Sequence, residues 1–369
     1  MQYKFLIVCL LFSISSFAQG KSLTGQQKTY YGNEMVSLQN AIQTHFFDSS
    51  KGFYREHDIL PVKSEHAYSY LWPLCGMIQA ANEIEKVTGQ KNVLQPIRQI
   101  IKSYYNASAP AAGYASYIMQ YGGGSRFYDD NQWIGLASMD AYFRTREPSL
   151  LQTGHTIYQF MMSGFDTTRG GGLYWEEGKK DGKNTCSNGP GIILALQLYK
   201  ATKDKKYLDT ALQLYHWVNQ HLKSPSGIYY DNISMKSGRI GRAMFSYNTG
   251  TMLQSNVYLY ESTGDKKYLE EAVSLADSSL RYFYGTKKFR DGYWFNAVLL
   301  RGYQQLLKHV KDTKYILGFK ECVDNALRND KNEKGLMGKP KSQDLVNQSG
   351  MLEILARFAY LETKYNFNK

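Results

Sequence analysis

Two adjacent aspartates, Asp129 and Asp130, are the residues whose type and spacing best suit chemistry. They follow the glycine run Gly122–Gly124, and apolar residues at helical spacing come after them, so we expect the pair at the start of a helix. One carboxylate there would simply cap the helix, because unpaired N–H groups and the positive end of the helix dipole face it. Two adjacent carboxylates also repel each other, which raises the pKa of one of them, as a general acid requires.

Paired carboxyls are the usual machinery for hydrolysing a glycosidic bond. One protonates the leaving oxygen, while the other attacks the sugar at a separation of about 5–5.5 Å or activates water at about 6.5–9.5 Å. Neighbouring residues favour the short separation and a retaining reaction, provided that both side chains turn into one cleft. A regular helix would splay them about 100° apart, so the pair must lie at the irregular helix start that the glycine run permits.

The chain around this pair is repetitive. A glycine followed by aromatic or apolar residues recurs at Gly52, Gly113, Gly172, Gly227, Gly292 and Gly335. A nearly uniformly apolar helix is expected after each turn, and amphipathic stretches such as Tyr207–Val218 and Tyr268–Ala276 run between the turns. This alternation predicts an all-α fold, an (α/α)6 barrel of six helical hairpins. An open helical solenoid is the alternative, but it would require distinctive polar caps that the two ends of the sequence lack.

In such a barrel the N-terminal ends of the inner helices meet at one mouth. Asparagines stand near five of these ends, at Asn131, Asn188, Asn248, Asn296 and Asn347. Each alone is more often a helix cap than a ligand-binding residue. Together with aromatic residues they suit a sugar, because amides and carboxylates hydrogen-bond to hydroxyls while Trp and Tyr stack on the ring. The candidate sugar-binding residues are His66, Tyr128, Asn131, Trp133, Trp175, Asn188, Tyr247, Asn248, Asp291 and Trp294.

Some of these candidates have a structural alternative. His66 could be a structural histidine, and Asp291 could shape an Asp-Gly turn. Trp133 lies one helical turn beyond Asp129 and could belong to the core. Trp175 and Trp294, on expected loops, are better placed to stack on a sugar.

The N-terminus has the features of an export signal. Lys4 precedes an apolar run that ends at Ser16 and Ala18, so we expect a signal peptide over residues 1–18 and one catalytic domain over residues 19–369. The run is too short for a comfortable membrane span, and no later stretch reaches the required length. We therefore expect an exported protein, periplasmic, cell-surface or secreted, without a membrane span. An uncleaved anchor is the alternative.

The remaining composition argues against several classes of protein. The formal charge of +12 is dispersed in short pieces beside acids, which favours a solvated basic surface over nucleic-acid binding. Cys75, Cys186 and Cys322 lie far apart and form no Cys/His cluster, so we expect neither a disulfide framework nor a metal site. We expect no cofactor and a monomer.

The motif Tyr128-Asp-Asp-Asn-Gln-Trp133 resembles the paired-aspartate motif of glycoside hydrolase family 76, the endo-α-1,6-mannanases. Three further segments resemble motifs of that family in the same order: Leu71–Cys75, Cys186–Pro190 and Ser246–Gly250. The resemblance covers roughly residues 30–365, and Gln132 and the segment Tyr293–Arg301 depart from the family's pattern.

This resemblance implies an (α/α)6 barrel and an α-1,6-linked mannan backbone as the substrate. It also implies a retaining mechanism in which Asp129 is the nucleophile and Asp130 is the acid/base. Transglycosylation, with a sugar acceptor in place of water, remains an alternative, as does a non-catalytic glycan-binding protein with the same barrel. The unsaturated-uronide hydrolases, which are also six-hairpin barrels, use one aspartate, so the adjacent pair argues against their chemistry.

Overall fold

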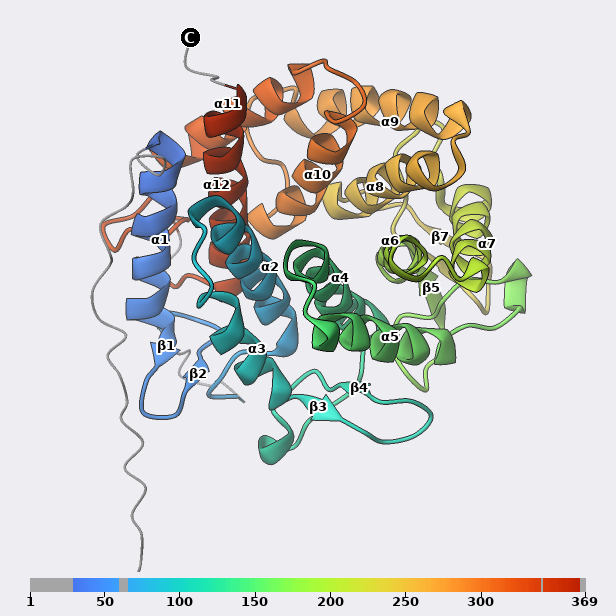
Figure 1. The fold of residues 1–369 in the computed structure, drawn as a ribbon, viewed down its shortest axis with the longest axis horizontal. Helices are drawn as coiled ribbons and strands as arrows, with labels where there is room; N and C mark the ends of the chain where they lie inside the picture. Colours follow the sequence, from blue (N-terminus) through green and yellow to red (C-terminus); the bar gives the residue numbers. More distant parts are fainter. Residues whose placement is uncertain (1–28, 60–65, 340, 366–369) are drawn as a thin grey trace, which may run out of the picture.

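The computed structural model describes residues 29–59, 66–339 and 341–365, and within them it contains twelve helices and seven short strands. The helices form two concentric layers (Figure 1). The expected signal peptide, residues 1–18, lies outside the described residues.

The inner layer is a closed ring of helices. It consists of α2 (Leu71–Thr88), α4 (Tyr128–Thr145), α6 (Thr185–Thr202), α8 (Ser246–Thr263), α10 (Tyr293–Leu306) and α12 (Leu345–Tyr365). Around it lie α1 (Tyr30–Phe46), α3 (Leu94–Lys102), α5 (Pro148–Ser163), α7 (Lys205–Leu222), α9 (Lys266–Tyr284) and α11 (Lys314–Asn329). Each inner helix packs against the next, and α12 packs against α2. The predicted (α/α)6 barrel is confirmed, and the open solenoid is wrong because α12 and α2 close the ring.

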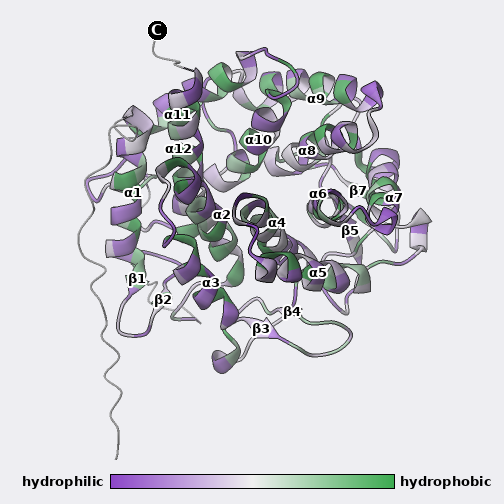
Figure 2. Cartoon of the chain, viewed as in Figure 1, coloured by the Kyte–Doolittle hydropathy of each residue, from purple (hydrophilic) through white to green (hydrophobic). Residues whose placement is uncertain are grey.

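The two layers differ in burial as the sequence predicts. Inner helices are buried on nearly all sides; the stretch from Ile192 to Leu196 on α6, for example, is buried throughout. Outer helices such as α7 and α9 are amphipathic, with hydrophobic and hydrophilic residues interspersed along them (Figure 2), and they bury one face. The repeated Asp-Lys-Lys-Tyr-Leu sequence starts two of them, because Asp204 and Asp265 accept hydrogen bonds from the backbone N–H two residues ahead and cap the helices.

Short antiparallel strands order the loops that lead into the inner helices. The pairs are β1 (Phe47–Asp48) with β2 (Phe53–Tyr54), β3 (Tyr105–Asn106) with β4 (Gly113–Tyr114), and the sheet of β5 (Gly182–Asn184), β6 (Asn232–Ser234) and β7 (Ile240–Gly241). Strands β5 and β6 join the loop before α6 to the loop before α8, with Lys183 opposite Ile233. This pairing fixes one wall of the barrel mouth.

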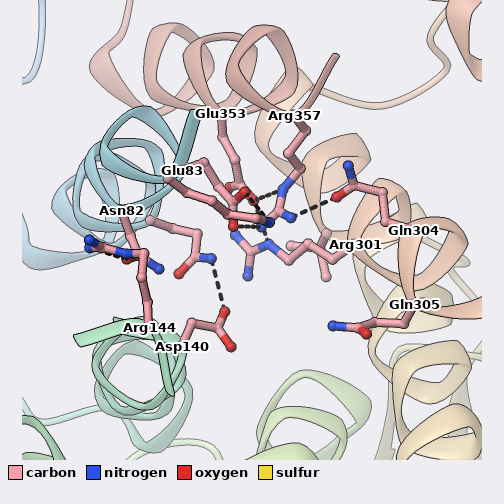
Figure 3. Close-up of polar contacts among 12 residues, drawn as sticks. Asn82, Glu83, Asp140, Arg144, Arg301, Gln304, Gln305, Glu353 and Arg357 are labelled. Carbon is pink, nitrogen blue, oxygen red and sulfur yellow. Dashed lines mark hydrogen bonds and ion pairs between the residues drawn. The ribbon is translucent and has the colours of Figure 1, made fainter. Parts of the chain in front are cut away.

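A buried ion network crosses the barrel interior (Figure 3). Glu353 of α12 is completely buried and accepts hydrogen bonds from Arg301 of α10 at 2.7 Å and from Arg357 at 2.8 Å. Arg357 also pairs with Glu83 of α2 at 3.2 Å. The Arg301 guanidinium, which pairs with Glu353, also lies 5.5 Å from the ring centre of Trp133. The network therefore links three inner helices to a tryptophan of α4.

Candidate active site

A cleft of about 1000 Å³ lies at the mouth of the barrel, over the N-terminal ends of α4, α6, α8 and α10. Its acidic lining residues are Glu56, Asp129, Asp130, Glu176, Asp181 and Asp231. Its aromatic lining residues are Tyr70, Trp72, Phe127, Trp133, Trp175, Phe245, Tyr247, Trp294 and Phe295. This volume is at the upper end of the range of about 300–1,000 Å³ for small-molecule sites, so the cleft has room for several sugar units.

Asp129 and Asp130 lie in the first turn of α4, and both line the cleft. The preceding loop turns sharply through Gly122, Gly123 and Gly124, whose φ angles are 112°, 71° and 90°. Only glycine adopts such a run without strain. The loop therefore delivers the chain to the helix start that the sequence predicts for the pair.

The two carboxyls have different surroundings. Oδ2 of Asp129 accepts a hydrogen bond of 3.2 Å from the indole Nε1 of Trp175, whereas its buried Oδ1 has no hydrogen-bond partner among the described residues. Burial raises the pKa of Asp129 to about 6, and the Cys186 thiol and the Trp175 indole oppose this rise because donors stabilise the anion.

The carboxyl of Asp130 has no comparable hydrogen-bond donors among the described residues. Burial and the charge of Asp129 raise the pKa of Asp130 well above its usual range. Asp129 is therefore the more readily ionised of the two carboxyls. Such a difference in pKa within one cleft suits one carboxyl to act as an anion and the other as an acid.

The floor of the cleft is aromatic. The rings of Trp133 and Trp294 meet edge to face at 5.0 Å and are nearly buried, and Trp72 meets Trp294 in the same way at 5.8 Å. Tyr247 stacks on Phe295 at 4.2 Å and forms part of the wall. Such surfaces suit the apolar faces of sugar rings.

Two buried cations hold the loops of the mouth. Arg126 pairs with Glu177 and donates to four backbone carbonyls of residues 106–111. Lys183, completely buried, binds the Asp166 carboxylate at 2.8 Å and three carbonyls. A buried charge is stable only when paired and hydrogen-bonded in this way, so these contacts fix the segment that carries Trp175.

The inner-helix amides hold turns of the chain. Asn131 accepts from the N–H of Tyr114 at 2.6 Å and donates to its carbonyl at 2.9 Å, and Asn188 makes the same pair of bonds to Leu173 at 2.7 and 3.0 Å. Both asparagines are completely buried. Asn248 lies behind the cleft wall, where it donates to Asp231 at 3.1 Å. These three side chains support the site and do not line the cleft.

Replacing Asn188 by alanine is expected to lower the free energy of unfolding by about 2–4 kcal/mol, because each buried backbone group left without a partner costs about 1–3 kcal/mol. Urea unfolding of the purified variant measures the loss. Asn329→Ala is the matched control, because this asparagine is exposed and its side chain bonds to no described residue other than Asn325; it should change stability by less than about 0.5 kcal/mol. Equal stability of the two variants would contradict the role of Asn188 as a clamp.

The other sequence candidates fall into two groups. Trp133, Trp175, Tyr247 and Trp294 line the cleft with the aspartates. The expectation of a loop position is wrong for Trp294, which lies in the first turn of α10 and is as buried as Trp133. His66 packs against Tyr117 at 4.2 Å, Tyr128 packs behind α4 against Phe160 at 5.0 Å, and Asp291 accepts from the backbone N–H of Ser246 at 2.7 Å, so the structure places these three outside the cleft lining.

Several cleft residues were not predicted. Trp72 lies within Leu71–Cys75, one of the family-like motifs, and Phe295 directly follows the candidate Trp294. Both positions could therefore have been proposed from their neighbours in the sequence. Asp231 and Asp181 gave none, because the loops that place them are set by the pairing of β5 with β6.

Groups that could serve other chemistry are few. Among the described residues, no group of three or more His, Cys, Asp and Glu side chains could hold a metal ion. Cys75, Cys186 and Cys322 are buried free thiols. None of the described helices combines the length and the hydrophobicity needed to cross a membrane.

The closed barrel, the carboxyl pair and the aromatic cleft are those of the (α/α)6-barrel glycoside hydrolases. Within that class, the chain belongs to glycosyl hydrolase family 76, whose family model matches residues 27–316.

Curated relatives match part of the chain. The mannan endo-1,6-α-mannosidase DCW1 of Candida glabrata is 29% identical over 171 residues, which is 42% of this chain and 38% of that protein. The protein of the same name from Saccharomyces cerevisiae is 28% identical over 172 residues, again 38% of its length. The match therefore spans less than half of these relatives.

Solved structures match nearly the whole chain. The family 76 mannosidase Bt3792 of Bacteroides thetaiotaomicron is 25% identical with a TM-score of 0.82, over 91% of this chain and 100% of that one. The α-1,6-mannanase GH76A of Salegentibacter sp. HEL1_6, at 23% identity and a TM-score of 0.77 over 90% of this chain and 100% of that one, shares the fold. A variant of that mannanase with two consecutive aspartates replaced by asparagine is described as inactive and was solved with α-1,6-mannotriose.

Proposed function

We propose that this protein hydrolyses α-1,6-mannosidic linkages within mannan backbones, with retention of configuration. The observation that carries the proposal is the pair Asp129 and Asp130 in one cleft, the first favoured as an anion and the second as an acid. The linkage is suggested by the names of the family relatives.

In the proposed reaction, Asp129 attacks the anomeric carbon while Asp130 gives its proton to the glycosidic oxygen that leaves. The C–O bond to the leaving sugar breaks as the bond to Asp129 forms, which yields a mannosyl-enzyme. Asp130, now an anion, removes a proton from water, and the resulting hydroxide displaces Asp129. Trp133, Trp175, Tyr247 and Trp294 would contact the sugars from the floor and wall of the cleft.

The position of the pair favours cleavage inside a chain. The cleft is lined by Glu56, Tyr70 and Ser116 on one side of α4 and by Asp231 and Phe245 on the other. Sugar units can therefore bind on both sides of the aspartates, as endo action requires. The remaining candidates, His66, Tyr128, Asn131, Asn188, Asn248 and Asp291, would support this cleft from outside its lining.

A time course with unbranched α-1,6-mannan tests the proposal. Purified protein is expected to release a ladder of short oligosaccharides, with the α-anomer formed first by NMR. Mannose alone from the start would contradict endo action, and initial formation of the β-anomer would contradict retention. Tight binding of the polymer without any product would instead support a glycan-binding protein.

Transglycosylation is the second candidate, because the aromatic lining of the cleft favours a sugar over water as the acceptor. Products longer than the substrate, formed when mannobiose is added in excess, would establish it. We further propose export of a monomer by a signal peptide over residues 1–18, with one catalytic domain over residues 19–369; the family match begins after that segment, at residue 27.

A further inference from the structure

Trp175 is exposed in the cleft yet bound to a catalytic carboxylate. Its side chain is 44% exposed, whereas Trp133 and Trp294 of the floor are 3% and 2% exposed. It lines the cleft, and its Nε1–H is engaged with Oδ2 of Asp129 at 3.2 Å. The same side chain thus faces both the substrate space and the carboxylate.

The backbone fixes Trp175 to the segment that starts α4. The Trp175 carbonyl accepts from the N–H of Tyr128 at 3.0 Å, and the N–H of Glu177 donates to the carbonyl of Arg126 at 3.0 Å. The ring of Phe127 lies 4.9 Å from the Trp175 ring. These contacts set the indole at a defined position relative to Asp129, two residues after Phe127.

The bond to Trp175 falls on one oxygen of the Asp129 carboxylate, Oδ2. Oδ1 of Asp129 is shielded from solvent, so we assign Oδ2, the oxygen bonded to Trp175, as the one that meets the substrate. A carboxylate held through one lone pair of Oδ2 keeps the other lone pair for the sugar.

We propose that Trp175 is a positioning residue whose indole N–H orients the Asp129 carboxylate and stabilises its anion while the ring face supports the sugar. The inference rests on the proposed function, in which Asp129 is the nucleophile. It gives the loop between α5 and α6 a direct part in catalysis, because any shift of that loop moves the donor away from the nucleophile.

The test is Trp175→Phe, which keeps an aromatic face and removes the N–H. With α-1,6-mannan, kcat should fall about tenfold to a hundredfold, the size expected for a lost hydrogen bond to a charged group, while KM changes little. Without the donor the anion is less stable, so the pKa of Asp129 rises. In a plot of kcat/KM against pH, the rise on the acidic side (the acid limb) reports the ionisation of Asp129. It should therefore move to higher pH by about one unit.

Trp72→Phe is the matched control. Trp72 lines the same cleft and is 37% exposed, but no described hydrogen bond joins it to a carboxylate. This variant should raise KM and leave the acid limb in place. If Trp175→Phe behaves in the same way, Trp175 is only a platform and the proposal is overturned.

A titration without substrate separates this inference from the proposed function. Because the indole is bonded to Asp129, its fluorescence should change as that carboxyl ionises, with a midpoint near pH 6 that disappears in Trp175→Phe and in Asp129→Asn. If the protein shows this transition but cleaves no mannan, the proposed function is wrong and the contact between Trp175 and Asp129 still stands. Mannan cleavage with no such transition, and with an unmoved acid limb in Trp175→Phe, would overturn the positioning role alone.

Discussion

Replacing Asp130 by asparagine is expected to lower mannan hydrolysis by about 10²–10⁴-fold, the usual contribution of a general acid. Asp129→Asn is expected to lose at least as much, because an amide cannot form the mannosyl-enzyme. Both variants keep the shape of the cleft, since asparagine has the size of aspartate. Initial rates on α-1,6-mannan at pH 7 measure the loss.

The same variants should be as stable as the parent or more stable at neutral pH. Burial raises the pKa of both carboxyls, and the charge of Asp129 adds to the rise at Asp130, so the folded protein binds more protons than the unfolded chain. Stability from such groups is fully present at low pH and is lost as pH rises through the folded pKa. For Asp129→Asn, the gain in thermal melts should therefore be absent below about pH 4, grow as pH rises, and be fully present above about pH 6.

Asp140→Asn is the matched control for this pair. Asp140 lies on the same helix, outside the cleft, and accepts from Gln79 at 3.0 Å and from Gln197 at 2.7 Å. Burial raises the pKa of Asp140 as well, so this variant is a control for activity: it removes a buried carboxyl of α4 that does not line the cleft, and it should keep its activity. Near-full activity in Asp129→Asn or Asp130→Asn would refute the paired mechanism at that residue.

Local patterns predicted the barrel and the position of the aspartate pair. Hydrophobic spacing predicts which helix faces are buried. The amphipathic stretch Tyr207–Val218 lies in α7, which buries one face, and the apolar runs after the glycine turns lie in the buried inner helices. Asp129 and Asp130 lie at the start of α4 for the same reason, because a glycine run and a helical pattern are both local signals.

The direction of individual side chains was harder to predict. Asn131 and Asn188 turn toward the backbone of Tyr114 and Leu173, which are 17 and 15 residues away, so no local pattern fixes them. Tyr128 directly precedes the aspartates, but its ring packs against Phe160 of α5 and does not line the cleft. Asp231 reaches the cleft only through the register of a three-stranded sheet.

Glu353→Ala is expected to give the largest loss of stability in the barrel, about 3–5 kcal/mol, as found when one partner of a buried ion pair is removed. Burial alone would raise the pKa of Glu353, but Arg301 and Arg357 outweigh it and hold the pKa below its usual range. Alanine would leave these two guanidiniums side by side in the interior (Figure 3). Urea unfolding at pH 7 measures the loss.

The pH dependence and a double variant test whether unpaired charge causes the loss of stability in Glu353→Ala. Because the pKa of Glu353 is depressed, its contribution should decline as pH falls through the folded pKa, and the variant and parent should converge in acid. Arg301→Met with Glu353→Leu removes one charge of each sign and leaves Arg357 paired with Glu83, so it should recover most of the loss.

An exposed ion pair supplies the reference for these variants. The side chains of Lys205 and Asp209 are 79% and 55% exposed, so Asp209→Ala should change stability by less than about 1 kcal/mol. If the double variant is as unstable as Glu353→Ala, unpaired charge is not the cause of the loss. The arginines would then serve mainly to fill the space beneath Trp133, where the Arg301 guanidinium lies 5.5 Å from the ring centre.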